Sequence, residues 1–220
     1  MIEQIEIRNL LPCVFAGMED TDRIRSSQIW EEPSFVFHRG CRLCVHAESG
    51  NGKSSLLHFI YGSRKDYKGS ILFDGTDISA LSIAQWCDVR TKGIALLPQD
   101  MALFPELTVG QNIDLKNNMT HHKTSEQIKD LLARLGIDDK HDVAAGKLSI
   151  GQMQRVALVR AVCQPFDFIF LDEPVSHLDA RNNKIVADII TGEANSQGAG
   201  IISTSVGNHL MLDNAKFVSL

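Results

Sequence analysis

The chain has 220 residues, of which 44% are hydrophobic and 22% charged, and its formal net charge at pH 7 is −5. These values are typical of a soluble globular protein with a sizeable core. The negative net charge argues against a nucleic-acid-binding protein, which usually carries an excess of basic residues. No apolar run approaches the roughly 18 to 20 residues that span a bilayer. The opening segment MIEQIEIRNLL carries two glutamates, which argues against a secretory signal, so we expect membrane contact only through a partner.

The first 40 residues carry the strand patterns IEIRN and SFVFH without a strong helical pattern, and they predict an antiparallel side sheet. Residues 14–30, between these strands, are polar and predict a loop. Further strand and helix patterns follow in the order RLCVHA, 53–61, SILFD, IALLP, 107–117, 124–135, 149–163, FDFIFLD, 178–192, GIISTS and KFVSL. Strands that alternate with helices predict a mostly parallel sheet covered on both faces.

Residues 100–148 contain helical patterns with little strand signal, so we expect a helical subdomain inserted into one domain that spans residues 1–220. The helix in TSEQIKDLLARLG is well delimited, because Thr124 and Gln127 match a capping box and Gly136 suits the position after the last turn. The predicted fold class is therefore α/β, with a central mostly parallel sheet, an N-terminal antiparallel side sheet and a helical insertion.

Five cysteines at irregular spacing predict free thiols in a reducing cytoplasm. Cys41 and Cys44 form a CxxC, which raises the alternative of a metal or redox pair. On the strand predicted there, residues three apart point to opposite faces, so we favour structural thiols.

A glycine-rich stretch lies between the strand RLCVH and a helix, in the pattern GxxxxGK[ST] of phosphate-binding loops, except that Ala47 takes the place of the first glycine. Gly50 and Gly52 allow backbone N–H groups to turn inward around phosphate oxygens. We expect Lys53 to reach the β and γ phosphates and the Ser54 hydroxyl to bind Mg²⁺. The predicted nucleotide-binding residues are Ala47, Glu48, Ser49, Gly50, Asn51, Gly52, Lys53, Ser54 and Ser55.

A second candidate site feature is a pair of acidic residues. Asp172 and Glu173 follow each other at the end of the apolar strand in FIFLDEP. Ligands of open α/β sheets bind at the carboxyl ends of the strands. Asp172 suits the Mg²⁺ shell, and Glu173 suits the general base that activates water. The alternative, a pair of exposed acids at a strand end, is weakened by the phosphate loop upstream.

Together with three further stretches, these residues resemble the ATPase subunits of ABC transporters over essentially the whole chain. LLPQDMALFPELTVGQNI resembles the Q-loop region, with Gln99 as its glutamine. LSIGQMQRVALVRAV resembles the LSGGQ signature and its helix, although Ser149 and Gln152 also match a simple capping box. SHLD resembles the D-loop.

The resemblance implies an ATPase that dimerises around two MgATP. It implies that Gln99 joins Ser54 and Asp172 around Mg²⁺, contacts the attacking water and couples to the membrane partner. It also implies an aromatic ring stacked on adenine, for which Phe15 is the nearest candidate and Trp30 the alternative. The residues supplied to the opposite nucleotide site would be Ser149, Gly151, Gln152 and Asp179.

The sequence departs from the family at two further positions. Ile150 replaces the first glycine of the signature, and Ser205 stands where the family has a histidine that contacts the γ-phosphate. His209 lies four residues on, and we favour an ordinary surface role for it over a substitute for the missing imidazole. We expect hydrolysis that is slowed but not abolished, because Lys53 and Glu173 remain.

The leading function is thus an ATP-hydrolysing subunit that drives a transmembrane permease, as a dimer with itself or with a related subunit, in the cytoplasm at the inner face of the membrane. The alternative is a regulatory module that binds nucleotide with slow or no hydrolysis. An ABC-type DNA-repair or translation protein is disfavoured by the absence of coiled-coil arms or a basic surface, and a small-molecule kinase does not explain LSIGQMQR beside FLDEPVSHLD.

Overall fold

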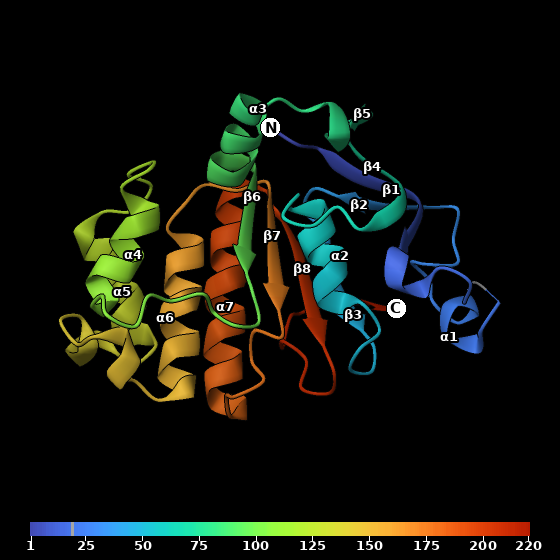
Figure 1. The fold of residues 1–220 in the computed structure, drawn as a ribbon. Coiled ribbons are helices and arrows are strands. Elements are labelled where there is room, and N and C mark those ends of the chain that lie inside the picture. The colour runs from blue at the N-terminus through green and yellow to red at the C-terminus, as the bar shows by residue number, and fades with distance from the viewer. Residues whose placement is uncertain (19) are drawn as a thin grey trace.

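The computed structural model describes residues 1–18 and 20–220, and within them the strands form two sheets of different kinds (Figure 1). One sheet is parallel, and its strands in spatial order are β6 (Ile94–Leu97), β7 (Phe168–Asp172), β8 (Gly200–Ser205), β3 (Arg42–His46) and β9 (Lys216–Ser219). The other is antiparallel, in the order β2 (Ser34–His38), β1 (Gln4–Pro12), β4 (Tyr67–Phe73) and β5 (Thr76–Asp77). The predicted α/β class with an antiparallel side sheet is confirmed.

Helices cover both faces of the parallel sheet. On one face, α2 (Lys53–Ile60) lies between the two sheets, and on the other lie α6 (Ile150–Val162) and α7 (Ala180–Gln197) (Figure 1). The alternation of side chains along β7 serves both faces, since Phe168 and Phe170 join the core around α2 while Ile169 and Leu171 join the core around α6 and α7. Every residue of this strand is buried, and its first four residues are apolar, as expected of a strand covered on both faces.

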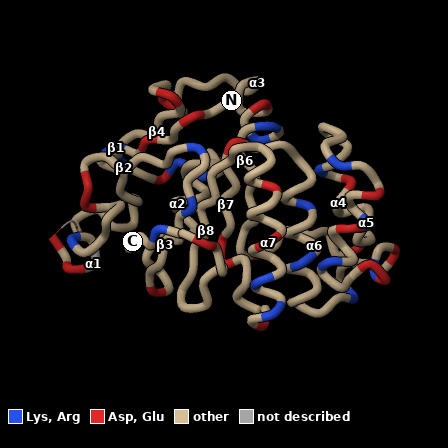
Figure 2. Tube along the Cα trace, turned by 180° about the vertical axis from the view of Figure 1, so that it is seen from behind, with Lys and Arg blue, Asp and Glu red and all other residues tan. Residues whose placement is uncertain are grey.

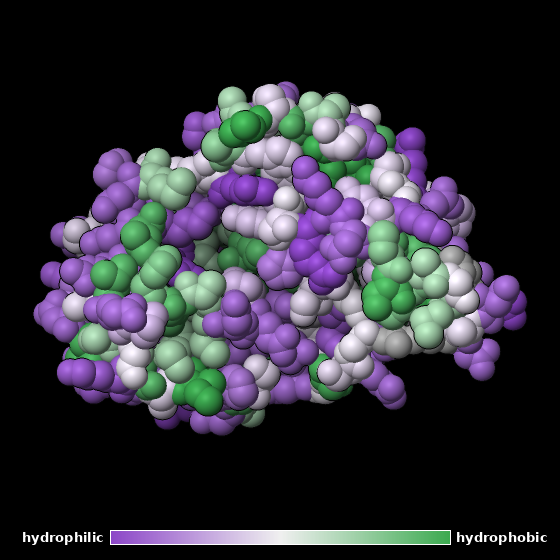
Figure 3. Space-filling model, viewed as in Figure 1, coloured by the Kyte–Doolittle hydropathy of each residue, from purple (hydrophilic) through white to green (hydrophobic). Residues whose placement is uncertain are grey.

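The helical part of the chain packs against α6. It contains α4 (Val109–Asn117) and α5 (Ser125–Arg134), and residues 100–148 contain no strand beyond one isolated bridge. The predicted capping box of α5 forms, with Thr124 and Gln127 each bonded to the backbone of the other. Apolar side chains gather on the surface over α4 to α6 (Figure 3). The exposed large apolar residues of the segment 100–148 are Phe104, Leu115 and Met119.

Two expectations fail near the edges of the molecule. Residue 19 of the predicted loop 14–30 lies outside the described residues. The described part of the segment contains a 3₁₀ turn (Cys13–Phe15) and the short helix α1 (Asp22–Arg25). It also buries Phe15, Ile24 and Trp30, which a polar surface loop would not do. The patterns also missed α3 (Ile83–Asp88), which is six residues long and buries no side chain, so no helical period marks it.

A glycine is required where β1 and β4 pair. The register of β1 shifts between Arg8 and Leu11, and Gly69 of β4 lies against this bulge with φ +91°. A Cβ at this position would lie 2.3 Å from the Asn9 carbonyl oxygen, so no other residue fits without moving the backbone.

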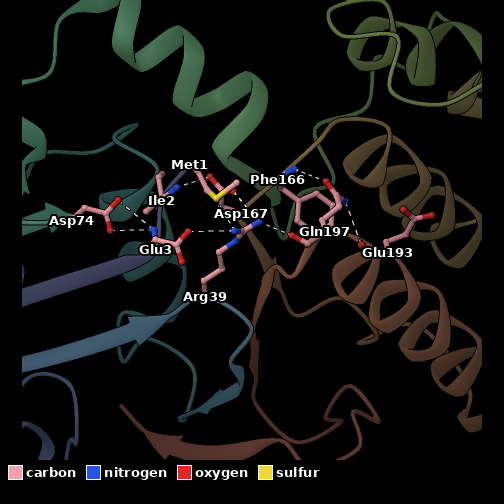
Figure 4. A network of polar contacts seen from close by, with 9 residues as sticks. All are labelled: Met1, Ile2, Glu3, Arg39, Asp74, Phe166, Asp167, Glu193 and Gln197. Carbon is pink, nitrogen blue, oxygen red and sulfur yellow. Dashed lines mark hydrogen bonds and ion pairs between the residues drawn. The ribbon is translucent and has the colours of Figure 1, made fainter.

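A polar network at the amino end of β7 joins the two sheets (Figure 4). The carboxylate of Asp167 accepts a hydrogen bond from the Ile2 amide at 2.7 Å and lies 3.5 Å from the Arg39 guanidinium. Arg39 also pairs with Glu3 at 3.3 Å and donates to the Gln197 carbonyl oxygen at 2.5 Å. The first residues of the chain are therefore held against the start of β7 and the end of α7.

Charged residues of both signs are spread along the trace (Figure 2). None of the helices in the described part of the chain combines the length and the hydropathy that a bilayer crossing requires.

Candidate nucleotide-binding site

The phosphate loop lies at the carboxyl end of β3 and leads directly into α2. Gly52 caps that helix in the left-handed region, with φ +93°, and Gly50 has φ +85°. The positive φ favours glycine at position 52, and a Cβ there would lie 3.2 Å from the ring of Trp30, which is a tight contact. The loop therefore has the backbone form that exposes N–H groups at a helix start, as the sequence predicts.

Lys53 holds this loop closed. Its side chain is buried, and its Nζ donates to the carbonyl oxygens of Ala47 at 2.8 Å and Glu48 at 2.9 Å. Burial lowers the pKa of Lys53, and the nearby carboxylates of Glu173 and Asp172 partly offset that effect. The ammonium is thus a desolvated cation, and the low local dielectric strengthens its attraction for a phosphate group, whereas the two nearby carboxylates oppose the approach of an anion.

The acidic pair occupies the end of β7, next to β8. Asp172 is 3% exposed, and its Oδ1 accepts a hydrogen bond from the Thr204 hydroxyl at 2.6 Å. Its Oδ2 is buried and has no hydrogen-bond partner among the described residues. A buried carboxylate oxygen without a partner is costly unless a ligand satisfies it, so this atom marks a binding position.

Two adjoining cavities bring the predicted residues together. The first has a volume of about 190 Å³ and is lined by the phosphate loop, including Lys53 and Ser54, together with Gln99 and Glu173. The second, of about 290 Å³, is lined by Ser54, Gln99 and Asp172 and also by His58, Pro98 and Asp100. Segments far apart in sequence therefore meet at one edge of the sheet.

The second cavity fits a magnesium ion. It gathers a hydroxyl, an amide and a carboxylate, which supply the oxygen ligands that Mg²⁺ prefers. The free Oδ2 of Asp172 provides the anionic ligand. Ser54 and Asp172 are the Mg²⁺ ligands expected from the motifs, and Gln99 is the one that the family resemblance implies. All three line this cavity.

The two candidate adenine-stacking rings lie beside the loop. Phe15 and Trp30 are 4% and 6% exposed, and both would contact a Cβ at Gly52. Phe15 and the exposed Val14 line the first cavity, whereas Trp30 donates its indole N–H to the Asn51 carbonyl oxygen at 3.2 Å. Phe15 is thus placed to meet a ligand, and Trp30 supports the loop from behind.

Ser205 lies next to the loop but faces away from both cavities. Its carbonyl oxygen accepts from the Ala47 amide at 3.4 Å, while its hydroxyl is hydrogen-bonded to Nδ1 of His209 and lies 3.7 Å from the Cys44 sulfur. Thr204 points to the opposite face of β8, toward Asp172. His209 folds back onto Ser205, but its ring packs against Phe217, and neither residue is among the described residues that line the two cavities.

The signature segment and the D-loop lie elsewhere on the surface. Ser149 caps α6 and forms the predicted capping box with Gln152, and the Ile150 side chain is 52% exposed. Asp179 caps α7 by accepting from the Asn182 amide. Both helix starts are exposed and outside the cavities, so in a single chain they do not reach its own phosphate loop.

The cysteines form no cluster with the site. All five are free among the described residues, and burial raises the pKa of Cys41 to about 11 and that of Cys163 to about 12. Buried thiols of this kind stay protonated at neutral pH, which agrees with the structural role expected of Cys41 and Cys44.

Sequence reasoning missed several residues of the site. His58 and Asp100 line the second cavity, and Thr204 binds the acidic pair. The parallel register of β7 and β8 pairs Asp172 with Thr204, so a hydroxyl residue near the end of a neighbouring strand was the available signal. Gln154, whose contacts are described below, lies in α6 and left no signal beyond the polar stretch QMQR.

Residues 30–176 match the ABC transporter family. Over 165 residues, the chain is 30% identical to the ABC transporter ATP-binding protein YtrE of Bacillus subtilis, covering 74% of this chain and 71% of YtrE. It is 35% identical over 151 residues to the xylose import ATP-binding protein XylG of Escherichia coli, covering 65% of this chain but only 29% of XylG.

Solved structures agree on the fold. The dimeric cassette MJ0796, a bacterial ABC transporter cassette, superposes with a TM-score of 0.73 at 19% identity, over 98% of this chain and 94% of that one. A bacterial Atm1-family ABC exporter with ATP bound gives 0.72 at 22% identity, over 99% of this chain and 37% of the exporter. On the sequence matches and this fold, the chain belongs to the ABC transporter family as an ATP-binding subunit of the ABC type.

Proposed function

We propose that this chain hydrolyses ATP as a dimer and drives a transmembrane permease from the cytoplasmic face of the membrane. One observation supports it most: Lys53, Gln99 and Glu173 line a single cavity at the phosphate loop. Its relatives include a transporter ATP-binding protein and a dimeric cassette, and the helix starts at Ser149 and Asp179 remain exposed for a second copy.

In this proposal each residue has one task. The loop amides and the ammonium of Lys53 bind the β and γ phosphates, and Glu173 accepts a proton from the attacking water. Ser54, Gln99 and Asp172 would hold Mg²⁺, which neutralises phosphate charge when it is bound. Closing a second protomer over the site brings Ser149, Gly151, Gln152 and Asp179 to the nucleotide and excludes water, so ATP binds the closed dimer more tightly than the open form.

The orientation of Ser205 supports a slow rate of hydrolysis. Its hydroxyl is hydrogen-bonded to His209 on the face of β8 that points away from Asp172, so this short serine side chain does not reach toward the γ-phosphate as a longer histidine would. A single lost contact to a charged group lowers the rate about ten- to a hundredfold. The Ser205→His variant should therefore raise kcat, with little change in MgATP affinity.

Phosphate release from MgATP tests the proposal. The parent should release phosphate continuously, and Glu173→Gln should bind MgATP normally, release almost none and accumulate as a dimer in size-exclusion chromatography. If Glu173→Gln turns over like the parent, the assignment of the base is wrong.

The second candidate is a regulatory module that closes on ATP without useful turnover. The exposed Ile150 at the signature position favours it, because a branched side chain there keeps the backbone of one protomer away from the nucleotide of the other. MgATP binding and dimerisation in the parent without phosphate release would select the module over the transporter ATPase.

A further inference from the structure

Glu173 has an unusual backbone conformation. Its φ is +49°, in the left-handed region, which is unfavourable for a residue other than glycine. Such a conformation persists only where neighbouring groups hold it in place. The groups that hold Glu173 therefore also fix the direction of its carboxylate.

Two buried side chains form hydrogen bonds with the backbone of Glu173, one with its amide and one with its carbonyl group. The Glu173 amide donates to the Thr204 hydroxyl oxygen at 3.1 Å, and the same hydroxyl donates to Asp172. The Glu173 carbonyl oxygen accepts from Nε2 of Gln154 at 3.0 Å. Thr204 is 1% exposed and Gln154 is 5% exposed, so water does not replace either contact.

Gln154 also holds the segment that follows. Its Nε2 lies 3.3 Å from the Ser176 hydroxyl, and its Oε1 accepts from the His177 amide at 3.3 Å. The N–H donor and the oxygen acceptor of the Gln154 side-chain amide therefore both form hydrogen bonds with the segment from Glu173 to the start of α7. Gly151, one turn earlier in α6, lies against the same loop, since a Cβ there would be 3.3 Å from the His177 carbonyl oxygen.

The position of Gln154 in α6 gives this contact its significance. It lies little more than one turn after the exposed helix start at Ser149 and Ile150, within one continuous helix of 13 residues. Gln154 therefore belongs to the same helix as that exposed start, and its amide connects this helix to the Glu173 carbonyl oxygen.

We propose that Gln154 is a positioning residue for Glu173, which ties the acidic loop of a protomer to the helix that the same protomer presents to its partner's nucleotide. This inference rests on the proposed role of Glu173 as the base. Gln154 touches no reacting atom, and it acts by holding the Glu173 peptide.

The test compares Gln154→Met, which keeps the length of the side chain without hydrogen bonds, with Gln164→Met. Gln164 is a matched control because it is also buried beside α6 and donates to a backbone carbonyl, that of Ile94, far from the acidic loop. We expect Gln154→Met to lower kcat about tenfold with KM within about twofold of the parent, and Gln164→Met to change neither.

Amide hydrogen exchange of residues 175–178 provides a readout that needs no turnover. We expect about tenfold faster exchange there in Gln154→Met, with MgATP affinity unchanged, and no change in Gln164→Met. If Gln154→Met unfolds, Gln154→Leu replaces it, because that side chain is also apolar and can neither donate to Glu173 nor accept from His177.

The outcomes separate the two proposals. If the parent releases no phosphate, the proposed ATPase fails, and the exchange result alone decides whether Gln154 holds the loop. If the parent hydrolyses ATP but the Gln154 variants keep both its kcat and its exchange rates at residues 175–178, the positioning role is overturned while the ATPase stands.

Discussion

Replacing Asp167 with alanine removes the carboxylate that connects the start of β1 to the start of β7 (Figure 4). Its hydrogen bond with the Ile2 amide, at 2.7 Å and buried, contributes about 2 kcal/mol because the acceptor is charged. The ion pair with Arg39, with side chains 10% and 19% exposed, adds about 1 kcal/mol after screening. We therefore expect a loss of about 3 kcal/mol, which lowers the Tm by about 6 to 12 °C in a chain of this size.

Urea and thermal unfolding followed by circular dichroism measure this loss, provided that one m-value describes parent and variant. Glu3→Ala is the matched control, because Glu3 pairs with the same guanidinium but its side chain is 65% exposed. We expect less than about 1 kcal/mol for this control. Equal losses in the two variants, or a loss below about 1 kcal/mol for Asp167→Ala, would refute the reasoning that burial decides the strength of these contacts.

Further predictions concern the phosphate loop and one strand. Lys53→Met should weaken MgATP binding about a hundredfold in calorimetry, and unchanged affinity would contradict the assigned site. Because burial lowers the pKa of Lys53, the folded, nucleotide-free protein loses this proton at a lower pH than the unfolded chain does. The free energy of unfolding should therefore rise as the pH increases from that lowered pKa to the unfolded-state value. MgATP affinity should fall over the same pH range, and Lys53→Met should show neither change. Trp30→Phe keeps a ring behind the loop but loses the N–H donor to Asn51, so urea unfolding should show a loss of about 1 kcal/mol; a parent-like value would mean that the bond contributes nothing. Gly69→Ala should cost about 3 kcal/mol or more in thermal unfolding, because its Cβ meets backbone at 2.3 Å, whereas Gly75→Ala, with the same sign of φ and open space, should cost about 1 kcal/mol; similar costs would show that steric contact is unimportant.

Local patterns were sufficient for most of the fold and much of the site. The phosphate loop with Lys53 and the acidic pair Asp172–Glu173 are each contiguous in sequence, and their chemistry depends on immediate neighbours. Their meeting follows from a general rule, since the carboxyl ends of parallel strands share one edge of a sheet. Gln99, the third residue of the first cavity, came from family resemblance, because a single glutamine after a strand has no chemical signature of its own.

The missed features depend on contacts that are distant in sequence. The segment around Trp30 has apolar residues at no regular period, and its burial depends partly on β9, where Ser219 and Gln28 exchange backbone and side-chain hydrogen bonds. Gln154 is a polar residue within an amphipathic helix, and only the packing of α6 on the acidic loop turns its amide inward. Neither property can be read from a local window.

The place of β3 in the parallel sheet has a consequence for biosynthesis. Its ladder partners are β8 and β9, and pairs such as Leu43 and Ile202 lie at opposite ends of the sequence. A nascent chain leaving the ribosome therefore carries its phosphate loop on an unpaired strand until residues 200–219 emerge, and strand pairing over such separations is slow. Nucleotide affinity should arise abruptly once residues 200–219 have emerged and paired, and until then the unpaired apolar strand is exposed to aggregation.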